Sequence, residues 1–177
     1  DDAVGEAFDK VAKILGLSYP GGYEIEKQAM SGNENSFELP QPLTKENNLN
    51  FSFSGLKTSI NLISKKNKMD DSFIKNISAS FQKCVANILI TKLNKAIKSI
   101  DRTRYNNLSA SVVGGVANNK YLKKCFENLE KENGIKILYP PEFMMSDNAA
   151  MIAWATILKY SKNNDLDFKP NPRLTIS

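Results

Sequence analysis

The chain has 177 residues, of which 41% are hydrophobic, so it can bury a core and is not a disordered sequence. It contains no histidine and two cysteines, which excludes a histidine-ligated metal site built by this chain alone, a histidine general base and a disulfide scaffold. The net charge of +5 suits contact with polyanions without establishing it. No apolar run approaches the ~20 residues of a membrane span, so we expect a cytoplasmic protein with reduced thiols.

The first predicted element is a helix from Asp1 to Leu17, with Gly16 as its stop. Asp9 falls beside the apolar stripe of this helix, where spacing alone favours a solvated carboxylate at the rim. Because a helical pattern starts at Asp1 without a methionine, the chain resembles a piece cut from a longer protein, although processing or a cloning boundary would give the same start.

A turn follows and leads into a second helix that ends near Met30. The turn holds Gly21 and Gly22, and glycines directly before a helix allow the backbone to approach a ligand closely. Glu26 lies one turn into the helix. It is either an acceptor that reaches a ligand at the turn or an exposed charge near a helix start.

The middle of the chain combines short strand candidates with a long helix. Residues 37–39 and 50–53 are predicted as strands, and Ser54 is predicted to cap a helix from Leu56 to about Ser64. The apolar stripe from Asp70 to about Ile100 predicts a central helix. Its outer face is either solvated or part of a patch that binds polyanions, and the side chains concerned are Lys83, Lys92, Lys95, Lys98, Arg102 and Arg104.

The stretch from Leu108 to Leu122 reads as a short apolar strand, a turn at Gly114-Gly115 and a helix start at Asn118-Asn119. This arrangement is typical of loops that hold nucleotides, because free N–H groups at a helix start face the ligand. A complete dinucleotide or phosphate-loop motif is lacking, so a plain strand-to-helix connection fits the residues as well.

A last strand is predicted from Ile135 to Tyr139 and a last helix from Ala149 to about Tyr160. Asp147 stands at the start of this helix. Position alone favours a helix cap, and the alternative is a carboxylate that holds a cation in a cleft. The polar residues 161–177 are predicted to follow the surface. The whole order indicates an α/β lobe with a small mixed sheet, in which ligands lie beyond the carboxyl ends of strands.

Four segments resemble, in order and spacing, the carboxyl-terminal part of the TsaD/Kae/Gcp family. They are DDAVGEAFDKVAKILGLSYPGG, FSFSGLKTSI, VVGGVANNKYL and MMSDNAAMIAWA, and the resemblance spans nearly the whole chain. These proteins are tRNA N6-adenosine threonylcarbamoyltransferases, once called O-sialoglycoprotein endopeptidases. The resemblance implies the actin-like, Hsp70-like ATPase fold, with two α/β lobes and a ligand cleft between them.

The resemblance also implies the reaction and its residues. Family members transfer threonylcarbamoyl from threonylcarbamoyl-AMP to N6 of adenosine 37 in tRNAs that read codons beginning with A, together with partner proteins of the threonylcarbamoyladenosine complex. By motif match, the substrate-binding positions are Asp9, Gly22, Glu26 and Asn119, of which Glu26 is the less direct match. Asp147 matches the aspartate that binds one iron or zinc ion beside two histidines of an HxxxH-type motif.

The amino-terminal lobe with these histidines is missing from the chain, so we expect the chain alone to be inactive. Two other functions stay open. One is a non-catalytic scaffold of the same fold, although the intact SDNAA motif around Asp147 favours the enzyme. The other is an actin-like kinase or ATPase, which would need a phosphate loop that this chain does not show.

Overall fold

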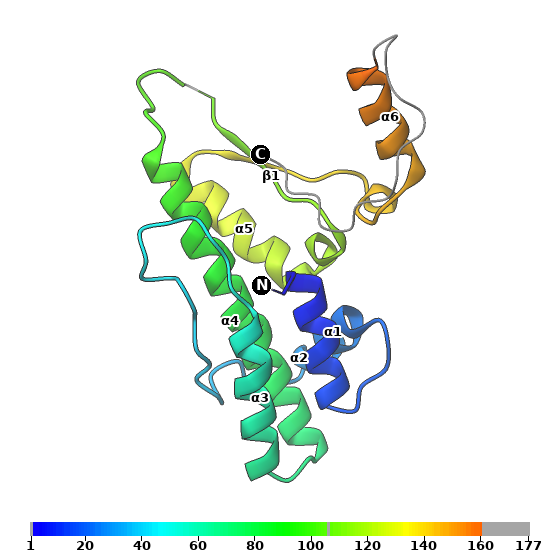
Figure 1. The fold of residues 1–177 in the computed structure, drawn as a ribbon. Helices are drawn as coiled ribbons and strands as arrows, with labels where there is room; N and C mark the ends of the chain where they lie inside the picture. The colour runs from blue at the N-terminus through cyan, green and yellow to red at the C-terminus, as the bar shows by residue number, and fades with distance from the viewer. Residues whose placement is uncertain (1, 106, 161–177) are drawn as a thin grey trace. The chain divides into compact units, whose positions relative to one another are not determined.

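A computed structural model describes residues 2–105 and 107–160 (Figure 1). These residues divide into two compact units, Asp1–Met145 and Ser146–Ser177. The surface path predicted for residues 161–177 lies outside the described residues.

The first unit holds five α-helices, two short 3-10 helices and two strands among the described residues. In chain order they are α1 (Val4–Ile14), α2 (Gly21–Ala29), α3 (Ser54–Lys66), α4 (Asp71–Ser99), β1 (Ser109–Ser111), η1 (Gly115–Asn118), α5 (Lys120–Asn133), β2 (Lys136–Leu138) and η2 (Glu142–Met144). The second unit contains α6 (Ala149–Lys159). The helices predicted from apolar periodicity are therefore confirmed, with ends that shift by a few residues.

Helix α4 is the central element of the first unit, as its apolar stripe predicted. Figure 1 shows α1, α2 and α3 around one half of α4, and α5 with the strands at the other half. In the first half, Phe8 of α1 packs edge-on against Phe81 of α4 with ring centroids 4.9 Å apart. In the second half, Ile97 of α4 shares a cluster with Leu122 and Phe126 of α5 and Ile137 of β2. Burial of these side chains stabilises the unit by roughly 1.5–3 kcal/mol each.

Strands β1 and β2 pair in parallel, with Ala110 opposite Ile137. Helix α5 is the crossover between them, as expected for parallel neighbours. The predicted mixed sheet is thus a two-stranded parallel sheet in the part of the chain that the structure describes. The carboxyl end of β1 leads directly into the Gly114-Gly115 turn.

The two other strand predictions are wrong. Residues 37–39 belong to a loop that docks on α4, where the Phe37 ring packs edge-on against Phe73 (5.4 Å) and the Phe37 N–H donates to Ser80 Oγ (3.2 Å). Residues 50–53 are irregular too, and their alternation reflects a single buried ring, Phe53, beside the exposed Phe51. Alternating burial therefore identified an extended segment here and not a sheet strand.

Two predictions about polar side chains also need correction. Ser54 is the first residue of α3 and Phe53 stands at the cap position, so Ser54 is not the N-cap. Lys92 of α4 is 1% exposed and not solvated. Its ammonium donates to the carbonyl oxygen and to Oδ1 of Asn48, at 2.8 and 3.0 Å. The 44–48 loop crosses α4 here, and burial lowers the pKa of Lys92.

Candidate functional site

A pocket of about 540 Å³ opens in the first unit, between α1, α2 and the connection from β1 to α5. This volume is in the range of small-molecule sites. The four residues predicted to bind substrate, Asp9, Gly22, Glu26 and Asn119, all line it. Helix α1 supplies Asp9, α2 supplies Gly22 and Glu26, and the start of α5 supplies Asn119.

Asp9 is half-buried and holds the start of α2. Its Oδ1 accepts a hydrogen bond from the Gly21 N–H at 2.9 Å. The residue at the cap position of α2 is Pro20, whose side chain offers no acceptor. Asp9 of α1 supplies the acceptor for the start of α2 instead. The expectation of a solvated rim carboxylate is therefore wrong, because α2 packs over this part of α1. The second oxygen, Oδ2, has no hydrogen-bond partner among the described residues.

The two glycines of the turn have different roles. A Cβ at Gly21 would lie 2.7 Å from the Asp9 Cα and 2.8 Å from the Ala12 Cβ, so only glycine lets α2 approach α1 this closely. A Cβ at Gly22 would meet no atom within 4 Å. Gly22 thus presents bare backbone to the pocket, where a ligand can come close.

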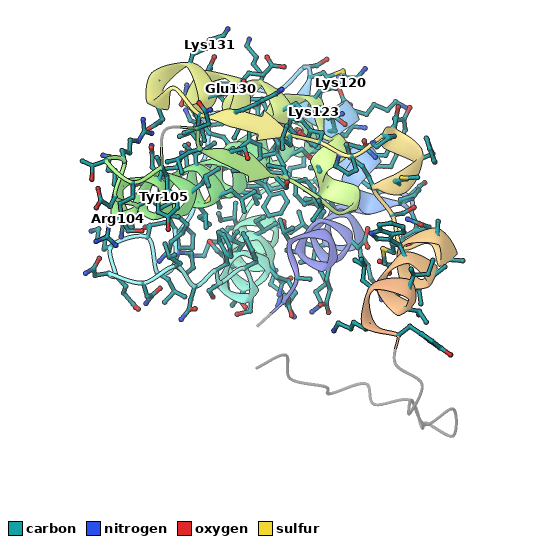
Figure 2. All side chains as sticks on the ribbon, turned by 90° about the horizontal axis from the view of Figure 1, so that it is seen from above. Arg104, Tyr105, Lys120, Lys123, Glu130 and Lys131 are labelled. Carbon is teal, nitrogen blue, oxygen red and sulfur yellow. The ribbon has the colours of Figure 1, made fainter. Side chains whose placement is uncertain are left out.

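Glu26 links α2 to the start of α5. Its Oε1 accepts from the Lys120 N–H at 2.6 Å, which satisfies one of the free N–H groups at that helix end. A carboxylate at a helix start is further stabilised by the helix dipole. Figure 2 shows the Lys120 side chain at the outer edge of the unit, so the backbone of Lys120, and not its ammonium, meets Glu26.

Asn119 is the N-cap of α5 and is only 6% exposed. Its Oδ1 accepts from the Leu122 N–H (2.9 Å), and its Nδ2 donates to Gln82 Oε1 of α4 (2.7 Å). An amide has two donor hydrogens and two acceptor lone pairs, so one of each remains for a ligand. The prediction that Asn119 opens a helix is confirmed.

The turn before Asn119 forms the remaining wall. Gly114 has φ of +91°, a conformation that favours glycine, and it follows the end of β1 by three residues. Asn118, in the last position of η1, has a buried Oδ1 without a hydrogen-bond partner among the described residues. Asn118 and the two rings of Tyr19 and Tyr23 were not predicted as site residues. The tyrosines border the predicted glycine turn, which was the available signal.

The charged side chains that line the pocket are all acidic. Asp9 and Glu26 are its two ionisable carboxylates, and no lysine or arginine is among the residues that line it. Such a lining favours a neutral ligand that donates hydrogen bonds, for example through sugar hydroxyls. It gives an anionic phosphate no cationic side chain among the residues that line the pocket.

A second, smaller cavity of about 260 Å³ lies between α4 and the 34–41 loop. Two of its charged groups are already paired, since Lys83 Nζ lies 3.1 Å from Glu34 Oε1. The Tyr121 hydroxyl donates to Glu34 Oε2 at 2.8 Å, and this hydrogen bond lowers the pKa of Glu34. With Glu34 and Lys83 engaged with each other and none of the residues matched by family resemblance in its lining, this cavity is the weaker candidate for a site.

Asp147 belongs to the second unit. It is exposed and precedes Asn148, whose Oδ1 caps α6 by accepting from the Met151 N–H at 3.0 Å. Asn148 is thus the cap that position alone had assigned to Asp147. No hydrogen bond or ion pair of Asp147 occurs among the described residues, so its carboxylate is not used by the local fold. That Asp147 binds a metal ion stays a prediction.

Comparison with known proteins gives the family. The profile of the family "TsaD: tRNA N6-adenosine threonylcarbamoyltransferase" matches residues 1–154. The chain belongs to this family. A relative from Rickettsia rickettsii (strain Sheila Smith) with this name is 42% identical over 181 residues, which cover 99% of this chain and 53% of the relative. One from Ehrlichia canis (strain Jake) is 46% identical over 179 residues, which cover 98% of this chain and 50% of the relative.

The chain therefore spans about half the length of these threonylcarbamoyltransferases. The family resemblance of the sequence segments is confirmed over nearly all of the chain. No helix in the described ranges is long and apolar enough to cross a membrane.

Proposed function

We propose that this chain is the carboxyl-terminal part of a tRNA N6-adenosine threonylcarbamoyltransferase, and that its pocket binds the adenosine part of threonylcarbamoyl-AMP. One observation carries the proposal. The residues that the family resemblance predicts to bind substrate, Asp9, Gly22 and Glu26 near the start of the chain and the distant Asn119, line a single pocket. In the complete protein we expect the actin-like, Hsp70-like fold, with the second lobe outside this chain.

The donor and acceptor groups of the pocket suit a nucleoside. Asp9 and Glu26 each use one oxygen within the fold, and the other oxygen is available to accept from a ribose hydroxyl. Asn119 offers its remaining N–H and lone pair to the nucleoside. Gly22 and Gly115, at which a Cβ would meet no atom within 4 Å, let the sugar or base lie against the backbone.

In the proposed reaction, N6 of adenosine 37 in the tRNA attacks the carbamoyl carbonyl of threonylcarbamoyl-AMP. The new C–N bond forms, the bond from the carbamoyl carbon to the phosphate oxygen breaks, AMP leaves and the amine loses a proton. The residues of this chain bind and position the adenylate, which brings the carbonyl within reach of the amine. The reaction implies a cytoplasmic protein that works with tRNA and with partner proteins of the modification complex.

The family resemblance also implies an iron or zinc ion, for which Asp147 would supply one oxygen. Among the described residues no group of three histidine, cysteine, aspartate or glutamate side chains is placed to hold a metal ion. These residues alone do not fit a metal site, and we propose that the remaining ligands come from outside the described part of the protein.

Transfer assays test the proposal. Threonylcarbamoyl-AMP and unmodified tRNA are incubated with the chain alone and with the complete protein that contains it, and threonylcarbamoyladenosine is measured by mass spectrometry. We expect product with the complete protein only. Turnover by the chain alone would overturn the division of labour proposed here.

The same preparations separate the alternatives. A complete protein that hydrolyses ATP without modifying tRNA would support a kinase or ATPase. One that does neither, and only binds its partner proteins, would support a scaffold.

A further inference from the structure

Two tyrosine rings at the pocket are unusually exposed. Tyr19, in the turn before α2, is 83% exposed, and Tyr23, in the first turn of α2, is 64% exposed. Both line the pocket. Phe8, the third aromatic residue of the lining, is buried in the core beneath. Exposed aromatic rings beside a pocket are characteristic of binding surfaces, because each ring offers a large rigid apolar face.

Neither tyrosine side chain makes a specific contact within the described part of the fold. No hydrogen bond, ring contact or cation contact of Tyr19 or Tyr23 occurs in the described ranges. Other aromatic residues are engaged there: Phe8 packs on Phe81, Phe37 packs on Phe73, and the Tyr121 hydroxyl donates to Glu34. The folding of the first unit therefore does not explain why aromatic rings stand at positions 19 and 23.

The rest of the lining indicates what such rings would bind. The carboxylates of Asp9 and Glu26 favour a neutral, hydroxyl-bearing group, and the absence of lysine and arginine from the lining disfavours an anionic one. A nucleoside combines hydroxyl donors with a flat neutral base. Every base has a π face, and stacking on an aromatic side chain contributes about 1–3 kcal/mol by alanine substitution.

We infer that Tyr19 and Tyr23 form the base-stacking wall of the pocket and bind a purine base. This inference rests on the proposed function and extends it from the sugar-binding residues to the base. The base is the adenine of a free nucleoside or nucleotide, or an unpaired adenine presented by RNA. The two sources share the same chemistry at the tyrosines.

Calorimetric titration of adenosine into the chain tests the inference. Alanine at Tyr23 or Tyr19 is expected to weaken adenosine binding roughly 5- to 150-fold, the range that follows from the stacking energy above. Tyr23→Phe keeps the ring and is expected to bind within about twofold of the unmodified chain. The matched control is Tyr105→Ala, because Tyr105 is 59% exposed and Figure 2 shows it far from Lys120, the neighbour of Asn119.

A second readout separates stacking from a structural effect. Ring-current shielding by a stacked base moves the Tyr23 ring proton resonances upfield, and loss of fold does not. Adenosine, AMP and two RNA hairpins, with an unpaired adenine or uracil at one loop position, are compared as probes. Shifts with adenosine or AMP assign the base to a nucleotide ligand, whereas shifts with the adenine hairpin only assign it to RNA.

The possible failures are distinct. If the unmodified chain binds adenosine and the tyrosine variants bind it equally well, the stacking inference is wrong and the proposed function is untouched. If the unmodified chain binds neither adenosine nor the adenine hairpin, the stacking inference and the assignment of the pocket to adenosine are both wrong, whereas the transfer assay decides the proposed activity by itself.

Discussion

Glu26 and Lys120 are joined by a hydrogen bond of 2.6 Å from the Lys120 N–H to Glu26 Oε1, which ties α2 to the start of α5. The 2.9 Å hydrogen bond from the Gly21 N–H to Asp9 Oδ1 ties α1 to α2 in the same way. The carboxylates that we propose to bind a nucleoside thus also hold the pocket walls together. Alanine substitutions would change both roles at once, whereas variants that keep the hydrogen-bond acceptor separate binding from folding.

Glu26→Gln is expected to fold normally and bind adenosine more weakly. The glutamine carbonyl can still accept from Lys120, while the charge that strengthens a hydrogen bond to a ribose hydroxyl is lost. We expect an unchanged melting temperature and roughly tenfold weaker binding, consistent with a loss of about 1.4 kcal/mol. Glu26→Ala should additionally lose about 1 kcal/mol of stability, because the helix start loses its acceptor. Equal melting temperatures for both variants would contradict the helix link.

The adjacent asparagines are expected to differ in their contribution to stability. Asn119→Ala removes the cap of α5 and leaves Gln82 Oε1 without its donor, at a combined cost of about 2–3 kcal/mol. Asn118→Ala removes a buried oxygen that has no partner among the described residues, and should cost little or nothing. Urea unfolding of the two variants measures the difference. Similar losses at both positions would show that the assigned cap is wrong.

Ligand binding by Asn119 is better tested with Asn119→Asp. Aspartate keeps an oxygen for the Leu122 N–H and is itself a good N-cap, while it removes the amide donor. We expect near-normal stability with weaker adenosine binding. Unchanged binding would remove Asn119 from the ligand site and leave it as a helix cap.

Substitutions at the neighbouring Gly21 and Gly22 are expected to affect different properties, stability at Gly21 and ligand binding at Gly22. Gly21→Ala forces a methyl group against the Asp9 backbone and the Ala12 side chain and should destabilise the chain by about 1–3 kcal/mol. Gly22→Ala places its methyl in open space within a helix, where alanine is favoured by roughly 0.5–1 kcal/mol. Gly22→Ala should therefore be at least as stable as the unmodified chain but bind adenosine poorly. Normal binding by this variant would place the ligand away from Gly22.

The thiol of Cys84 is expected to be unreactive in the folded chain. Burial raises the pKa of Cys84 to about 12, and the Sγ–H lies against the Pro40 carbonyl oxygen at 3.3 Å. Since the thiolate is the reactive form, alkylation should stay slow at pH 8 and accelerate only as the pH rises toward 12. Peptide mapping after iodoacetamide treatment should find Cys125, which is half-buried, modified first. Rapid modification of Cys84 at pH 8 would show that the 34–41 loop opens readily.

Local signals predicted much of the secondary structure. The apolar stripes gave α1, α4 and α5, and Gly16 and Gly134 end α1 and α5 with positive φ, as stop residues should. The strand predictions at residues 37–39 and 50–53 were wrong, because a strand forms only beside a partner strand and a local sequence pattern does not reveal that partner. The prediction that Lys92 is solvated was wrong for a related reason, since the loop that buries Lys92 lies more than 40 positions away in the sequence.

The candidate site could be predicted only where a motif existed. Asp9, Gly22, Glu26 and Asn119 were predicted as substrate-binding residues by resemblance. Spacing alone had assigned Asp9 to a helix rim and Asn119 to a helix start, and it had marked Gly22 as a point of close approach and Glu26 as either an acceptor or an exposed charge. Both descriptions hold for Asn119, which caps α5 and lines the pocket. Tyr19 and Tyr23 were not predicted as site residues, because an exposed tyrosine indicates a binding role only once the pocket beside it is known.

The central claim, that the pocket of Asp9, Gly22, Glu26 and Asn119 binds a nucleoside, is tested most directly by NMR. Adenosine is titrated into 15N-labelled chain and the backbone amide resonances are followed. We expect concentration-dependent shifts at Gly22, Gly115 and Asn119, and none at Asn35 and Ser80 of the smaller cavity. Shifts confined to the smaller cavity, or no shifts at millimolar adenosine, would contradict the account.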